Sequence, residues 1–357
     1  MKKYNKFIVL MLAIVLCFSL MCTGCSNNTE TSASGDEPEK ITVVDGLGRE
    51  ITLEKTPERI LTSYGIATQM VFTLGAQDRL VGIDSPSLTN KFLISLDPDI
   101  PNMATPGSPA EFNVEEGIAL NPDIILVPGR NQQLVETLEE KGLNVFGVVA
   151  EDLDQLKDTV QQLGKALGQE EQAEEYVKYY DNVIKEVEEK TASLSDGDKP
   201  TVYLAGPMGL LSTCSQDMYQ NDLITLAGGK NAAGELTGGW VDISPEQLIE
   251  WNPDVIVIVQ YTTNITPEDV LTDSRYQGIN AVKNKQVFWF PSNLSPWDYP
   301  SPEAAVGILW TAQKLQPDLF PDLDMIDEAD NYFETFYGKT FTELGGSLTS
   351  REYVEKS

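Results

Sequence analysis

The chain has 357 residues, 41% of them hydrophobic, which is enough for two domains of ordinary size. Its formal charge of −30 argues against nucleic acid or anionic lipid surfaces as partners. It contains no histidine, which removes the commonest general base and metal ligand. A histidine-built metal site, Ser-His-Asp chemistry and an enzymatic role in general are therefore not expected.

The first 24 residues are predicted to be a targeting segment, because three lysines precede an apolar run from Phe7 to Cys22. Such a run is short for a membrane span and typical of a signal peptide. It ends in Thr23-Gly24-Cys25, which resembles a lipobox, where cleavage precedes a cysteine that carries lipid. Cys22 stands where that motif usually has leucine, and ordinary secretion with cleavage elsewhere is the alternative. Cleavage before Cys25 leaves 22 basic and 55 acidic residues, a net charge of −33.

Residues 25–40 are polar and predict a disordered tether. Residues 41–168 alternate between strand and helix patterns, which predicts an N-terminal α/β lobe. A loop rich in proline and serine is expected to run to about Phe112. The predicted elements of this lobe are a hairpin at 41–44 and 50–53, strands at 59–63, 80–83 and 144–149, helices at 67–74, 132–141 and 152–168, and a unit of short helix, Asn-Pro-Asp turn and strand that ends at 127.

A long helix is predicted over 169–195, because Tyr176, Tyr180, Val183 and Val187 recur at three-and-four spacing. It lies between two similar halves of the chain, so it is expected to bridge them; a peripheral helix of one lobe is the alternative. Residues 196–357 predict a C-terminal α/β lobe. Both lobes are expected to be doubly wound parallel sheets, with a ligand cleft between them at the carboxyl ends of the strands. The predicted elements of the second lobe are strands at 201–205 and 286–290, helices at 219–226 and 302–315, and a second unit of short helix, Asn-Pro-Asp turn and strand that ends at 258.

One sequence motif occurs twice, at 121–127 and at 252–258, and each copy begins with Asn-Pro-Asp. A glutamate precedes each copy by six residues, Glu115 in the first and Glu246 in the second. Asn113 and Ser244 are good N-caps for the short helices that carry them, with Glu116 and Gln247 placed to close capping boxes. A favourable charge at a helix N-terminus accounts for either glutamate alone. It does not account for an exposed carboxylate at the same place in both lobes.

Together these features resemble the substrate-binding proteins of ABC importers for ferric siderophores, haem and cobalamin, which have two lobes joined by one long helix. The resemblance implies that Glu115 and Glu246 dock into arginines of the permease dimer, and that Cys25 carries the lipid anchor. The stretches that carry it are Pro57-Glu58-Arg59-Ile60, residues 74–82, Asn113-Val114-Glu115, Ala119-Leu120-Asn121-Pro122-Asp123, Ile243-Ser244-Pro245-Glu246-Gln247 and Trp251-Asn252-Pro253-Asp254.

Ligand contacts are expected from loops at the strand ends of both lobes. Arg130 follows the first repeated strand, and its guanidinium is suited to a carboxylate, catecholate or oxyanion. The proline-rich segment 295–302 is expected to hold large side chains rigidly as a ligand wall. The candidate ligand-binding residues are Tyr64, Arg130, Met208, Trp240, Tyr261, Trp297, Asp298 and Tyr299.

The sequence thus predicts a lipid-anchored solute-binding protein on the outer face of the cytoplasmic membrane. Its expected cargo is a ferric siderophore or related iron chelate, delivered to an ABC permease dimer and its ATPase. A corrinoid such as cobalamin and a small oxyanion such as molybdate are alternatives, and a surface scaffold or adhesin is the alternative of another class. No intrinsic cofactor or protein-held metal is expected, and no nucleic-acid partner.

Overall fold

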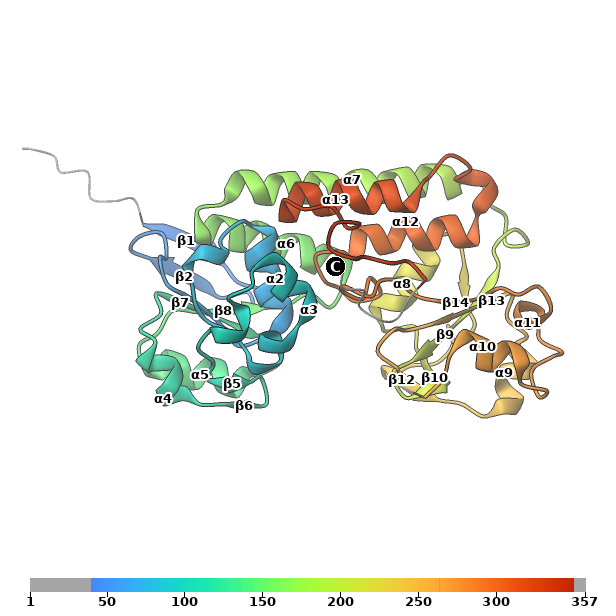
Figure 1. Ribbon diagram of the computed structural model, residues 1–357, viewed down its shortest axis with the longest axis horizontal. Coiled ribbons are helices and arrows are strands. Elements are labelled where there is room, and N and C mark those ends of the chain that lie inside the picture. The colour runs from blue at the N-terminus through green and yellow to red at the C-terminus, as the bar shows by residue number, and fades with distance from the viewer. Residues whose placement is uncertain (1–39, 263, 350–357) are drawn as a thin grey trace, which may run out of the picture. The chain divides into compact units, whose positions relative to one another are not determined.

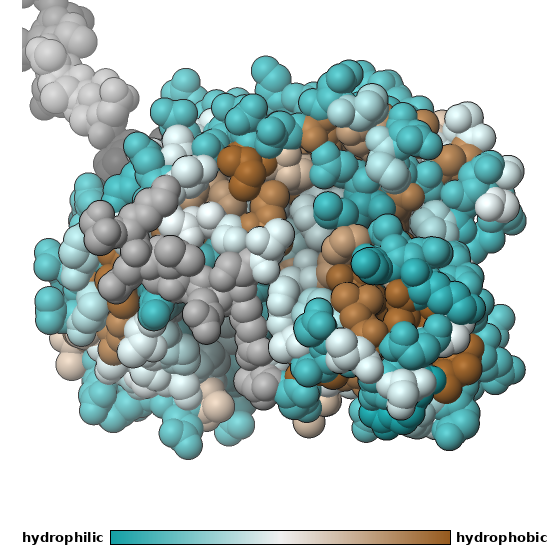
Figure 2. All heavy atoms as spheres, turned by 45° about the vertical axis from the view of Figure 1, so that its right-hand side comes forward, coloured by the Kyte–Doolittle hydropathy of each residue, from teal (hydrophilic) through white to brown (hydrophobic). Residues whose placement is uncertain are grey.

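The computed structural model describes residues 40–262 and 264–349 (Figure 1). The predictions for the signal peptide, for lipidation at Cys25 and for the tether up to residue 39 lie outside the described residues. Within the described ranges, no helix is both long and apolar enough to span a bilayer. Figure 2 shows polar side chains over most of the face turned toward the viewer, with apolar residues gathered in a few patches.

The first sheet has the order β4-β3-β7-β8, and all its neighbouring strands are parallel. All five residues of β7 are buried, as expected for a parallel strand covered on both faces. The antiparallel hairpin β1–β2 precedes the sheet, as predicted. The strands are β1 Ile41–Val44, β2 Glu50–Leu53, β3 Ile60–Thr62, β4 Leu80–Gly82, β7 Ile124–Pro128 and β8 Val145–Val148. The helices are α2 Gly65–Thr73, α4 Val114–Ala119, α5 Gln132–Glu140 and α6 Leu153–Leu167.

The loop predicted up to Phe112 contains structure that the sequence did not reveal. Helix α3, Lys91–Leu96, begins at Asn90, whose side chain accepts hydrogen bonds from the backbone N–H groups of Phe92 and Leu93. Its single turn and a half is too short to show a periodic apolar pattern. Short 3₁₀ turns flank it, and the small hairpin of β5, Gly107–Ser108, and β6, Glu111–Phe112, completes the segment.

The second sheet has the order β12-β10-β9-β13-β14, and β11 also pairs with β9. The expected parallel pairing holds for β9 with β13, β13 with β14 and β9 with β11. Strands β10 and β12 add two antiparallel pairings that were not predicted. The strands are β9 Thr201–Gly206, β10 Gly209–Cys214, β11 Lys230–Asn231, β12 Trp240–Asp242, β13 Val255–Ile258 and β14 Val287–Trp289. The helices are α8 Tyr219–Leu226, α9 Pro245–Trp251, α10 Pro267–Thr272, α11 Asn280–Lys283, α12 Ala304–Leu315 and α13 Met325–Tyr337.

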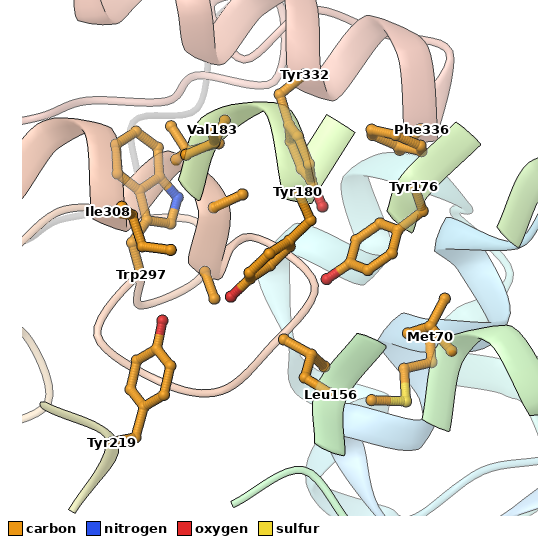
Figure 3. Packing of buried hydrophobic residues seen from close by; sticks show 14 of the residues in the cluster. Met70, Leu156, Tyr176, Tyr180, Val183, Tyr219, Trp297, Ile308, Tyr332 and Phe336 are labelled. Carbon is orange, nitrogen blue, oxygen red and sulfur yellow. The ribbon is translucent and has the colours of Figure 1, made fainter. Parts of the chain in front are cut away.

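Helix α7, Glu170–Thr191, joins the two halves, as the sequence predicted. It packs on α6 of the first lobe and on α12 of the second, and Figure 1 shows it running above both sheets beside α13. At 22 residues it is about 33 Å long. Its buried stripe includes Tyr176, Tyr180, Val183 and Val187. Figure 3 shows Tyr176 and Tyr180 in the core with Met70 of the first lobe.

The repeated Asn-Pro-Asp turn has a structural explanation. Asn121 and Asn252 both adopt left-handed backbone conformations, with φ of 48° and 46°, which asparagine tolerates better than most residues. The Asp123 carboxylate accepts hydrogen bonds from the N–H groups of Glu58 and Arg59 at 2.9 and 3.0 Å. Asp254 accepts one from Thr201 N–H at 3.0 Å. Each turn therefore ends a helix and fixes the start of the sheet's first strand, but neither role involves the preceding glutamate.

Candidate functional site

A cavity of about 710 Å³ lies between the two lobes. Tyr64 follows β3, Arg130 follows β7 and Glu151 follows β8, so the first lobe contributes the carboxyl ends of its parallel strands, as predicted. The second lobe contributes the start of α8, β12 and the segment after β14. The principal lining residues are Tyr64, Gln69, Asn90, Arg130, Glu151, Asp217, Met218, Tyr219, Gln220, Trp240, Ser295, Pro296 and Tyr299.

Arg130 is the single cationic side chain among the described residues that line this cavity. Its guanidinium carbon lies 5.4 Å from the centre of the Tyr64 ring, within the range of a cation–π contact. It belongs to none of the ion pairs formed between described residues. Burial raises the pKa of Tyr64, and Arg130 opposes that shift, so Tyr64 offers a neutral hydroxyl. An unpaired guanidinium beside a phenol is suited to an anionic group.

On the opposite wall, Tyr299 is supported from behind by buried groups. Its ring stacks on Tyr261 with centroids 4.8 Å apart and an interplanar angle of 15°. The Tyr261 hydroxyl donates a hydrogen bond of 2.8 Å to the Asp298 carboxylate, and the Gln220 side-chain amide donates one of 3.0 Å to the Asp298 carbonyl. Burial raises the pKa of Asp298 to about 6, although the bond from Tyr261 opposes the shift. Asp298 and Tyr261 therefore position the wall rather than form it.

Four of the eight candidate ligand residues line the cavity, namely Tyr64, Arg130, Trp240 and Tyr299. Their contact with a ligand stays a prediction. Met208 does not reach the cavity, because it lies in the tight β9–β10 connection with 73% of its surface exposed. Tyr261 and Asp298 lie behind the lining.

The expectation that Trp297 forms part of the wall is corrected by its burial. It is 0% exposed and lies 5.4 Å from the Phe341 ring, centroid to centroid. Figure 3 shows it in the core with Ile308 and Val183. The proline-rich segment does present its neighbours Pro296 and Tyr299 to the cavity. Trp297, the largest apolar side chain of this segment, fills the core beneath α12, because burying so large an apolar surface stabilises the fold more than exposing it to water.

Polar residues on helices α2 and α8 line the cavity but were not predicted. Gln69 and Gln220 are each at least nine-tenths buried. A glutamine on the apolar face of a helix can be detected in the sequence. It is a useful signal because a buried polar group normally requires a hydrogen-bond partner. The acidic residues Glu151 and Asp217 also border the cavity. Among the described residues, no group of three acidic or cysteine side chains is placed to hold a metal ion.

A second cavity of about 530 Å³ lies within the C-terminal lobe. Apolar and aromatic side chains including Leu271, Phe288 and Trp310 form much of its lining, and Lys314 lies over the Phe288 ring at 5.4 Å. It receives no residue from the first lobe. The cavity between the lobes is therefore the better match to the predicted ligand cleft.

The paired glutamates lie on α4 and α9, and Figure 1 shows both helices on the side of the sheets away from α7. The predicted N-caps are confirmed, because Asn113 accepts from the N–H groups of Glu115 and Glu116, and Ser244 accepts from that of Gln247. Glu116 does not close a capping box, since the Asn113 N–H donates to the Pro106 carbonyl instead.

The two glutamates are exposed but not equivalent. The Glu115 side chain is 80% exposed and lies 3.8 Å from the Lys141 ammonium, whereas Glu246 belongs to no ion pair between described residues. An exposed pair at that distance contributes little to stability. Both carboxylates are therefore available to an external partner, and docking stays a prediction.

Asp298→Asn should change how stability depends on pH. The pKa of Asp298 is near its usual 3.8 in the unfolded chain and about 6 in the folded one. The native state therefore binds the Asp298 proton more tightly than the unfolded chain does. The contribution of this proton to the free energy of unfolding is lost as pH rises from about 4 to about 6. That loss amounts to about 3 kcal/mol. Asparagine has no proton to lose, so the variant's stability relative to wild type should rise over this range in thermal unfolding. An equal difference at pH 4 and pH 7.5 would contradict the prediction.

Comparison with known proteins places the chain among solute-binding proteins. The molybdate-binding protein MolA of Haemophilus influenzae is 26% identical over 85% of this chain and 89% of its own length. An ABC transporter substrate-binding lipoprotein of Bacillus subtilis, YvrC, is 25% identical over 87% of this chain and 98% of its own length. Among solved structures, a periplasmic solute binding protein of Veillonella parvula has a TM-score of 0.77 at 25% identity, covering 86% of this chain and 96% of that one.

Other relatives are named as binding cobalamin and Fe(3+)-citrate. The sequence profile of the family described as "Periplasmic binding protein" matches residues 60–294. That stretch holds both sheets, helix α7 and most of the residues that line the cavity, whereas Ser295, Pro296, Tyr299 and Pro300 lie just beyond it. The chain therefore belongs to the periplasmic binding protein family.

Proposed function

We propose that this protein captures an anionic iron chelate, of the ferric siderophore or ferric carboxylate class, outside the cytoplasmic membrane and delivers it to an ABC permease. The observation that carries the proposal is Arg130, a guanidinium without an ion pair among the described residues, at the edge of a cavity walled by Tyr64, Trp240 and Tyr299. The rings supply flat apolar contact, and the guanidinium supplies a charged anchor for carboxylate or catecholate oxygens.

A small oxyanion such as molybdate is the second candidate. It is supported by the relationship to the molybdate-binding protein MolA. Arg130 serves either anion, so charge does not separate the two. Size favours the chelate, because a cavity of about 710 Å³ falls within the roughly 300–1,000 Å³ of sites for drug-sized ligands. A corrinoid remains a third ligand class, and it has little need of a guanidinium anchor.

The test is native mass spectrometry of the mature chain, with Cys25→Ser to keep it unlipidated, against ferric citrate, a ferric catecholate siderophore, cobalamin and molybdate. The chelate proposal expects one ferric complex to bind at one per chain, and molybdate and cobalamin to fail at equal concentration. Binding of molybdate alone would move the assignment to oxyanion uptake. Failure of all four probes would favour a surface scaffold or adhesin.

The location is proposed from the N-terminal sequence. The segment ending in Thr23-Gly24-Cys25 supports lipid attachment at Cys25, and the likeness to the lipoprotein YvrC agrees with it. Residues 26–40 would then hold the folded part within reach of the membrane, since 15 extended residues span roughly 50 Å. The permease is proposed to receive Glu115 and Glu246, the acidic residues that both lobes carry at matching positions.

A further inference from the structure

Glu303 is a buried carboxylate that the ligand cavity itself does not use. It stands at the N-cap of α12 with 0% of its surface exposed. The hydroxyls of Ser295 and Ser301 donate hydrogen bonds to its Oε2 at 2.9 and 3.1 Å, and the hydroxyl of Tyr337 donates to its Oε1. Three hydroxyl donors therefore converge on one side chain. Ser295 is also a lining residue of the cavity, so this cluster fixes part of the ligand wall from behind.

The same cluster continues into the first lobe. The Tyr337 hydroxyl on α13 lies 3.0 Å from the Thr73 hydroxyl at the end of α2. Helix α13 packs on α2, and the Tyr337 ring meets Phe92 of α3 edge-on with centroids 5.1 Å apart. The Lys339 ammonium, just after α13, donates to the Ser95 carbonyl at 2.6 Å. The C-terminal helix is thus a second tie between the lobes, besides α7.

When Glu303 is ionised, each hydroxyl in this chain has one proton to donate, and this determines which group donates to which. The single Tyr337 proton goes to Glu303, so the Tyr337 oxygen is left to accept from Thr73. Because the one Thr73 proton is then given to Tyr337, Thr73 cannot also donate to the Gln69 carbonyl, which lies 3.0 Å away. Helix α2, which carries Thr73, also carries Gln69, a residue that lines the cavity on the first-lobe side. The relay Thr73–Tyr337–Glu303–Ser295 therefore joins helix α2 of the first lobe to a residue that lines the cavity from the second lobe.

A buried carboxylate is a poor device for stability alone. Its desolvation offsets much of what its hydrogen bonds contribute, and an apolar residue of similar size is often as stable. Directional bonds, in contrast, hold neighbouring groups in one arrangement. Sequence positions as distant as 73, 303 and 337 meet here, and two of the elements involved carry cavity residues. The geometry is therefore better explained by positioning than by stability.

We propose that Glu303 is a positioning residue, which holds the Ser295–Pro296 wall in place and, through Tyr337 and Thr73, fixes the separation of the two lobes across the cavity. The expected effect of Glu303 on which ligand binds rests on the proposed function. The expected effect of Glu303 on the separation of the lobes does not depend on that function. In this protein the width of the cavity is set by side chains from both lobes as well as by the rigidity of α7.

The test measures lobe separation directly. Spin labels are placed at Glu136→Cys and Ser274→Cys, two exposed positions in different lobes, in the full mature chain with Cys25→Ser; Cys214 is buried and does not label. Double electron–electron resonance then gives the distance distribution without ligand. Glu303→Gln and Tyr337→Phe should broaden it. Tyr332→Phe is the matched control, because its hydroxyl donates to the Pro302 carbonyl in the same core but lies outside the relay.

Affinity is the second measurement, with ferric citrate and molybdate as probes. Glu303→Gln and Tyr337→Phe should each weaken whichever probe binds the wild type by about tenfold, and Tyr332→Phe by much less. If both relay variants keep the wild-type distance distribution, Glu303 is only a buried polar contact and the inference is wrong. If Glu303→Gln does not fold, Tyr337→Phe decides the matter alone. If neither probe binds the wild type, the label distances alone judge the relay, and the proposed function is judged by native mass spectrometry with all four probes.

Discussion

Replacing Glu115 and Glu246 together by alanine should abolish uptake of the transported solute, while solute affinity stays within about twofold of wild type. The two carboxylates are exposed on α4 and α9, away from the residues that line the cavity. Paired with arginines of a permease they would become desolvated charge pairs, and truncating one partner of such a pair costs about 2–5 kcal/mol. Uptake into cells and binding to the purified chain measure the two halves of the prediction.

Neighbouring acids on the same two helices provide the control. Glu116 on α4 and Glu250 on α9 are also exposed, so Glu116→Ala with Glu250→Ala removes the same charge at different positions. That control should transport normally. The single variants should differ, with Glu246→Ala the more severe, because Glu115 already lies 3.8 Å from Lys141. Full uptake by the Glu115/Glu246 double variant, or equal loss in the control, would exclude docking through these two residues.

Arg130→Ala should weaken binding of an anionic chelate or oxyanion by roughly 10- to 100-fold, since hydrogen bonds to charged groups contribute about 1.5–3 kcal/mol. Arg130→Lys keeps the charge but loses the planar fork that grips two oxygens, so its affinity should lie between wild type and Arg130→Ala. Titration calorimetry with the probe found by native mass spectrometry measures all three. Because the anchor is ionic, added salt should weaken wild-type binding more than that of Arg130→Ala.

Arg275→Ala is the matched control for the loss of one arginine. Its guanidinium pairs with Asp273 on the outer surface of the second lobe and does not line the cavity. It should leave affinity unchanged. A corrinoid, in contrast to an anionic chelate, should bind Arg130→Ala nearly as well as wild type. Unchanged affinity for an anionic ligand in Arg130→Ala would show that Arg130 does not contact it.

The long elements of this fold could be predicted because their patterns are local. Helix α7 shows its buried stripe in the spacing of Tyr176, Tyr180 and Val183, and each parallel strand is a short apolar run between turn residues. Helix α3 and strand β10 escaped prediction for the opposite reason. The first is too short to be periodic, and the second depends on a tight connection at Met208 that reverses the chain.

The sequence also placed half of the candidate ligand residues at the cavity. Tyr64 and Arg130 follow strands of a parallel sheet, and the edge at which such strands end is the usual ligand site. Tyr299 was expected from its rigid segment, but the same reasoning chose Trp297 as well. Nothing local separates the two, because one ring faces the cavity and the other faces the core only when α12 and the Phe341 ring are in place.

Short stretches of sequence were enough to predict the two α/β halves, the helix between them, the matched glutamates and the position of Arg130 directly after β7. Each of these follows from periodicity, turn chemistry or repetition within a few residues. Which aromatic rings face the cavity depends on how the helices pack, and the same packing brings Thr73, Tyr337 and Glu303 together from three distant parts of the chain. Such contacts depend on how whole elements pack, and packing is a property of surfaces that no single stretch of sequence contains.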